Sequence, residues 1–109
     1  MPFDEKLARR IRNLLKGWQS VEEKRMFGGL AFMVNGHMCC GVLNNDLVLR
    51  LGQEEYEEAI SHTHARPMDF TGRPLRGLLY VSPAGLRSAH SLRAWVGRSL
   101  RFVSTLPPK

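Results

Sequence analysis

The sequence predicts an α+β domain with the element order α-β-β-β-α-β-β-α. Two observations lead to this order: apolar residues recur at helical spacing near both ends of the chain, and strand-like segments joined by turn residues lie between them. A chain of 109 residues is long enough for one compact core and too short for two, so a single domain over residues 1–109 is expected. Its hydrophobic fraction of 43% and charged fraction of 24% are typical of globular proteins.

The first predicted helix begins after Asp4, a residue suited to capping it, and runs to about Lys16, with Gly17 as its stop. Its apolar stripe consists of Leu7, Ile11, Leu14, Leu15 and Trp18. The segment that follows, QSVEEK at residues 19–24, is expected to be a polar connector.

A three-stranded antiparallel meander is predicted from residue 26 onward. The segments 26–34 and 37–43 are joined by Asn35-Gly36, a pair that favours a type I′ turn with positive φ at both residues. A turn at 44–46 leads into a third strand at 47–51. The double glycine at 28–29 matches no phosphate-binding motif, and glycines inside a strand mark a bulge or a close backbone approach.

The second half of the chain is predicted to add two strands and two helices. A short helix is expected at 53–61, a short strand around 68–70 and another strand at 75–81. A turn at 83–85 precedes a final helix at about 91–105, which Pro107 and Pro108 end.

Basic residues are unevenly distributed along the chain, which has a formal net charge of +6. Five bases lie in the first seventeen residues, and no acid follows Asp69. This pattern suits either an anionic partner or a solvated basic surface. The candidate nucleic-acid-binding residues, expected to reach solvent opposite the apolar faces of the first and last helices, are Arg9, Arg12, Lys16, Arg93, Arg98 and Arg101. No base-reading motif is present, so binding to duplex DNA would be non-specific and sensitive to salt.

Cys39 and Cys40 are neighbours in a predicted strand, where successive side chains point to opposite faces. Only one of them is therefore expected to face the core, at most one to be exposed, and no disulfide to join them. An enzyme that uses one of these thiols is an alternative. His37, Cys39, His62 and His64 could in principle hold zinc, but their spacing fits no known finger, so no metal or cofactor is expected.

The chain has no apolar run of membrane-spanning length, and its first residues lack the apolar core of a signal peptide. A cytoplasmic protein without membrane contact is the expectation.

Four segments in order along the chain resemble one family. They are KRMFGGLAFMVNGHMCCGV (24–42), HARPMDFTGRPLRG (64–77), LLYVSPAGL (78–86) and LRAWVGRSLRFVSTLPPK (92–109). Together they are similar to the N-terminal domain of the competence regulator TfoX, also called Sxy, from about residue 3 to the C-terminus.

The resemblance implies a two-layer fold in which helices cover an antiparallel sheet, as in the secretion-chaperone-like fold. It also implies a non-enzymatic regulatory domain, similar to the first half of a positive regulator of DNA-uptake genes. The partners that this reading suggests are a protein of the transcription machinery, duplex DNA, and a second copy of the chain, as in a dimeric chaperone-like adaptor. The family supplies no established catalytic or binding residues to transfer.

Overall fold

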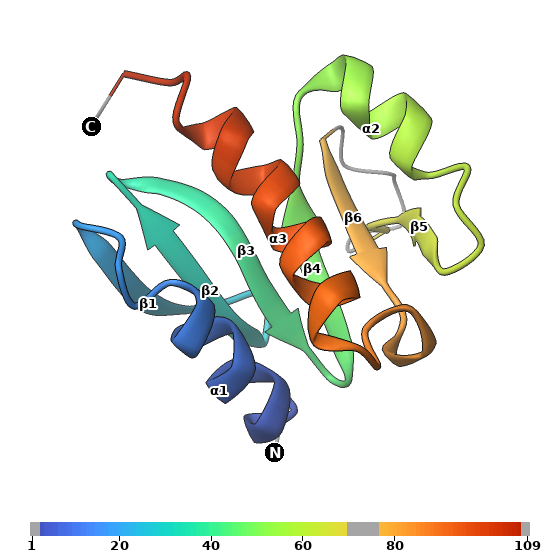
Figure 1. Cartoon of the computed structure of the whole chain (residues 1–109), viewed down its shortest axis with the longest axis horizontal. Coiled ribbons are helices and arrows are strands. Elements are labelled where there is room, and N and C mark those ends of the chain that lie inside the picture. Colours follow the sequence, from blue (N-terminus) through green and yellow to red (C-terminus); the bar gives the residue numbers. More distant parts are fainter. Residues whose placement is uncertain (1–2, 70–76, 108–109) are drawn as a thin grey trace.

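The computed structural model describes residues 3–69 and 77–107. Within them the chain forms three helices and six strands in the order α-β-β-β-β-α-β-β-α (Figure 1), which confirms the predicted α+β class with one strand more than expected. The elements are α1 (Glu5–Leu14), β1 (Val21–Met26), β2 (Gly29–Val34), β3 (His37–Leu43), β4 (Asp46–Arg50), α2 (Gln53–Ala59), β5 (Ala65–Pro67), β6 (Leu78–Val81), a short 3-10 turn (Pro83–Gly85) and α3 (Ala89–Val103).

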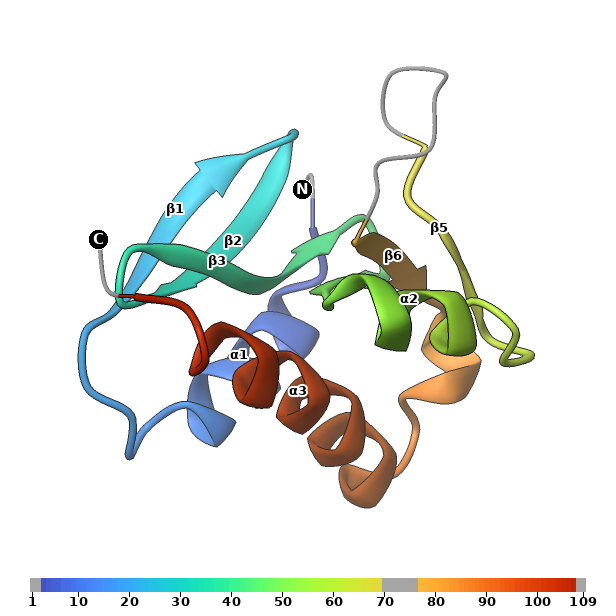
Figure 2. The same cartoon turned by 90° about the horizontal axis from the view of Figure 1, so that it is seen from above.

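The strands form one antiparallel sheet in the order β1-β2-β3-β4-β6-β5. Helices α1 and α3 lie side by side on the same face of this sheet (Figures 1 and 2). The core fills the space between the two layers. It includes Phe32, Leu49 and Leu79 from the sheet and Ile11 and Val96 from the helices, none more than 1% exposed. No helix in the described residues is long and apolar enough to cross a membrane.

The additional strand is β1, which replaces the polar connector that the sequence predicts. It pairs with β2 along its whole length, from Val21 opposite Val34 to Met26 opposite Gly29. Five of its six residues are exposed because β1 is at the edge of the sheet. The alternation of polar and apolar residues that identifies a half-buried strand is therefore missing from its sequence. The meander consequently has four strands.

Positive φ occurs in all three tight turns of this meander: at both residues in two of them, and at Asn44 alone, with φ of 54°, in the turn from β3 to β4. Asn35 and Gly36 join β2 to β3 with φ of 53° and 84°, as predicted for a type I′ turn. Phe27 and Gly28 join β1 to β2 in the same way, so Gly28 belongs to a turn and not to a strand. At Gly29 the backbone of a neighbouring strand comes close, as the sequence suggested. An added Cβ would lie 2.1 Å from the Val42 carbonyl oxygen.

The short strand predicted around 68–70 lies earlier, at Ala65–Pro67, and residue 70 is outside the described residues. Met68 instead packs into the interior, and its N–H donates to the Leu78 carbonyl at 3.1 Å. Helix α3 begins two residues earlier than predicted because Ser88 caps it, its Oγ accepting from the Ser91 N–H at 2.9 Å.

A β-bulge interrupts the pairing of β2 with β3. Phe32 lies opposite Cys40 and Met33 opposite Met38, which leaves Cys39 as an extra residue on β3. The bulge breaks the alternation of side chains, so both cysteines enter the core and both are 0% exposed. The expectation that only one faces the core is wrong. The expectations that at most one is exposed and that both thiols are free are confirmed.

Replacing Gly36 with Val should lower the free energy of unfolding by about 1 kcal/mol or more, because a β-branched residue is strained at positive φ. Urea unfolding of the two proteins measures the difference. Gly17→Val is the matched control, since Gly17 has open space around it and does not have positive φ. Equal losses in the two variants would contradict the turn assignment.

Candidate nucleic-acid interface

Arg10 connects the first helix to the start of the last one. Its Nη2 donates to the Leu86 carbonyl at 2.7 Å and to the Ser88 carbonyl at 3.4 Å. The sequence pattern had not distinguished Arg10 from the other bases near the N-terminus. A signal was present, however, because Arg10 is three residues after Leu7 and four before Leu14, which places a base at the edge of the apolar stripe.

This connection gathers basic side chains where α1 meets the beginning of α3, a surface that we call the basic seam. Its members are Lys6, Arg9, Arg10, Arg87 and Arg93. Lys6, Arg10 and Arg87 line one shallow hollow of about 250 Å³. Arg9 and Arg93 are exposed on the two helices. The acids of this region are Asp4, whose carboxylate caps α1 by accepting from the Lys6 N–H at 2.9 Å, and Glu5.

The structure separates the six residues predicted from sequence. Arg9, Lys16 and Arg93 are exposed, and no ion pair engages them within the described part of the chain. Arg12 is also exposed, but it makes a bidentate contact with Glu23 of β1, from Nε at 2.6 Å and Nη2 at 2.8 Å. This hydrogen bonding lowers the pKa of Glu23 and ties α1 to the edge of the sheet.

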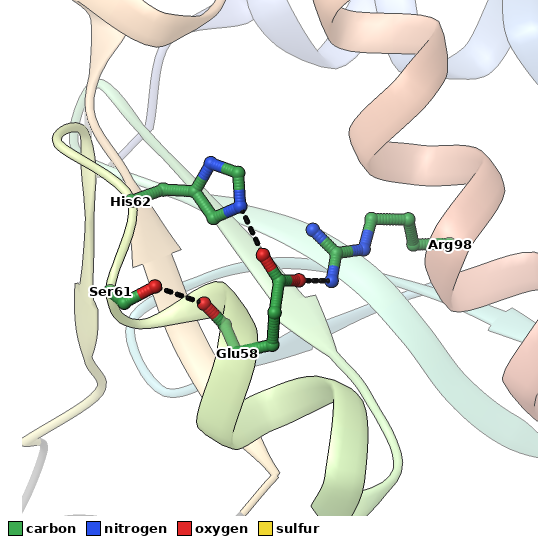
Figure 3. Close-up of polar contacts among 4 residues, drawn as sticks. All are labelled: Glu58, Ser61, His62 and Arg98. Atoms are coloured by element: carbon green, nitrogen blue, oxygen red, sulfur yellow. Dashed lines mark hydrogen bonds and ion pairs between the residues drawn. The ribbon is translucent and has the colours of Figure 1, made fainter.

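Arg98 is turned away from solvent, contrary to the prediction. Its side chain is 17% exposed and forms an ion pair with Glu58 of α2 (Figure 3). Its guanidinium carbon lies 5.2 Å from the centre of the Trp95 ring. Glu58 also meets His62 Nε2 at 2.6 Å, and the hydrogen bonds from Arg98 and then His62 lower the pKa of Glu58. Arg98 therefore holds α2 against α3.

Arg101 faces acidic surroundings. It lines a hollow of about 400 Å³ together with Gln53, Glu54 and Glu55 at the start of α2. The surroundings of the two halves of α3 thus differ in charge: the first half borders the basic seam, and the second half borders the acidic helix α2. The predicted residues do not form one continuous basic face.

The cysteine thiols are enclosed in the core. A hydrogen bond from the Cys40 thiol lowers the pKa of Cys39, with smaller contributions from Ser99 and Arg50, while burial opposes them. The pKa of Cys40 is raised well above its usual value by the same hydrogen bond and by burial. Neither sulfur has a route to a substrate in this conformation, because both residues are 0% exposed.

The histidines and cysteines considered as zinc ligands are not brought together. His37 Nε2 lies 2.6 Å from the Pro107 carbonyl oxygen, while His62 pairs with Glu58 on α2. Across residues 3–69 and 77–107, no group of three or more His, Cys, Asp or Glu side chains could hold a metal ion.

Comparison with known proteins gives one family. The family model of the TfoX N-terminal domain matches residues 13–103, most of the 109-residue chain. No curated protein matches the chain.

Replacing Glu58 with Gln should lower the melting temperature by a few degrees at most at neutral pH, because the ion pair with Arg98 is largely exposed on the Glu58 side. The pKa of Glu58 is lower in the folded state, so its contribution is present above the pKa of an unfolded glutamate and is lost as the pH falls through the folded pKa. The difference between the two proteins should therefore vanish in acid. Glu57→Gln, an exposed neighbour without an ion pair in the described residues, is the control and should change little at any pH.

Both thiols should react slowly with a thiol reagent in the native protein and quickly after unfolding in urea, since both are buried. The single variants Cys39→Ala and Cys40→Ala should each leave one protected thiol. A rapidly reacting thiol in either folded variant would show that the bulge does not place both residues in the core.

Proposed function

The chain belongs to the TfoX N-terminal domain family, and from this premise we propose that it is a non-enzymatic regulatory domain that holds duplex DNA by its phosphate backbone. The contact surface is the basic seam between α1 and α3. The family supports a regulatory role. The TfoX N-terminal domain is also not a known enzyme family. The burial of both thiols also argues against the alternative of a thiol enzyme.

The observation that carries the DNA contact is the pair of hydrogen bonds from Arg10 to Leu86 and Ser88. They hold α1 beside the start of α3, where Lys6, Arg10 and Arg87 line one hollow together with Asp4, and Arg9 and Arg93 are exposed on the same two helices. Lys and Arg side chains that neutralise phosphates release counterions, which supplies affinity without sequence preference. The net charge of +6 favours the same partner.

The expected affinity is modest because few phosphates can be met at once. Non-specific binding of this kind has dissociation constants on the order of micromolar or weaker, and it weakens steeply with salt. The contacts of the basic seam are with phosphates and not with base edges, so regulation would depend on where a protein partner places the domain. We propose that this protein partner belongs to the transcription machinery.

Binding isotherms on a short DNA duplex at two salt concentrations test the proposal. Arg93→Ala should weaken binding severalfold, equally on unrelated sequences, and should reduce the slope of log affinity against log salt by about one. Arg101→Ala is the matched control, because it removes the same side chain from the same helix beside the acidic start of α2. Its effect should be clearly smaller.

Two outcomes would reject the DNA contact: no binding at low salt, or equal effects of the two substitutions. In either case the protein partner alone would remain, and affinity capture from nuclease-treated lysate would address it separately.

A further inference from the structure

β1 presents a regular strand edge. On one side it pairs with β2, and among the described residues no strand pairs with its other side. The direction of its backbone groups follows from the register: Met26 and Gly29 flank the two-residue turn, and the Ser20 carbonyl accepts from the Asn35 N–H at 3.1 Å. The backbone N–H and C=O groups of the even-numbered residues of β1 therefore form hydrogen bonds with β2. Consequently, the N–H and C=O groups of residues 21, 23 and 25 point away from the sheet.

The two edges of the sheet are built differently. At the opposite edge, β5 has three residues and ends in Pro67, and short strands and proline both discourage pairing with another chain. β1 has six residues, with neither proline nor glycine, and its pairing with β2 is regular. Its four charged residues are two acids and two bases, so they can form opposite-charge pairs with a suitably aligned strand. Such a strand accepts a partner of the same composition.

We propose that β1 pairs antiparallel with β1 of a second copy of this chain, which joins the two six-stranded sheets into one. The two-fold axis passes beside Glu23. Residues equally far from Glu23 in opposite directions along the chain then lie opposite each other. Val21 therefore faces Arg25 of the second copy, and Glu22 faces Lys24. This register uses the outward backbone groups of Val21, Glu23 and Arg25 in both copies.

The side chains support this register on both faces of the sheet. Glu22 and Lys24 lie on the face away from the helices and meet as two opposite-charge pairs. On the helix face the two Glu23 side chains come opposite each other. Each is already held by Arg12 through two hydrogen bonds, which neutralises the like charges.

Exposed apolar side chains mark the same edge. Trp18 and Met26, 42% and 39% exposed, are the large apolar residues that the described part of the chain leaves most open to solvent. One precedes β1 and the other ends it. In the proposed register Met26 lies opposite Ser20 of the second copy, close to its Trp18 along the chain. Pairing would therefore cover apolar surface at both ends of the new strand pair.

The two-fold axis between antiparallel strands is perpendicular to the sheet. Both helical layers consequently lie on the same side of the joined sheet, with the Arg12–Glu23 contacts nearest the axis. The inference rests on the edge of β1 alone and does not depend on DNA binding.

Sedimentation equilibrium over a range of protein concentrations tests the pairing. The parent chain should form a dimer, and Glu22→Lys and Lys24→Glu should each raise its dissociation constant at least about tenfold, because each substitution turns two attractive pairs into repulsive ones. An equimolar mixture of the two variants should recover the parent affinity. In the mixed dimer both of these positions carry lysine in one chain and glutamate in the other, so opposite charges meet again.

Glu57→Lys, an exposed charge reversal on α2, is the control for net charge and should leave the dimer intact. Circular dichroism establishes that each variant is folded before it is measured. A parent chain that stays monomeric at about 1 mM overturns the proposal, because pairing that weak contributes no useful association. It is equally overturned if a single charge reversal leaves the dimer unchanged, or if the mixture fails to recover it.

Discussion

A buried hydrogen bond between the last helix and the bulged strand determines how the two layers of this domain fit together. The bulge leaves Cys39 without a residue opposite it on β2. Ser99, 0% exposed on α3, donates its hydroxyl to the Cys39 carbonyl at 2.6 Å. Without it, a buried acceptor would be left unpaired at a cost of about 1–3 kcal/mol. The bulge, the burial of both thiols and the position of α3 over β3 and β4 are thus parts of one arrangement.

The position of α3 then controls the charge of the surface. Its first half lies beside α1, where Arg10 donates to the carbonyls that precede the helix. Its second half lies beside α2, where Arg98 and Arg101 meet acidic side chains. A helix that carries bases along its length therefore presents them differently at its two ends. Acidic side chains of α2 thus compensate the bases in the second half of α3, while the bases beside α1 stay available at the basic seam.

The contact between Arg12 and Glu23 links the basic seam to the free edge of the sheet. The ion pair with Glu23 compensates the charge of the exposed Arg12, so this residue fixes α1 against β1 more than it adds to the basic surface. At the same time it neutralises the acid at the middle of β1. The basic seam and the free edge of β1 therefore share no residue. The ion pair between Arg12 and Glu23 nevertheless stabilises both surfaces, because it joins α1 to β1.

Features that depend on neighbours along the chain can be read from the amino-acid sequence. Helical periodicity located α1 and α3, and Asn35-Gly36 specified a turn whose positive φ these two residues tolerate. Features that depend on contacts between distant segments are fixed only in the folded chain. β1 is a strand because β2 lies beside it, the bulge at Cys39 is matched by a serine sixty residues away, and Arg98 turns inward because Glu58 is there to receive it. Local patterns cannot report such contacts, since each partner is an ordinary polar or exposed residue in its own segment.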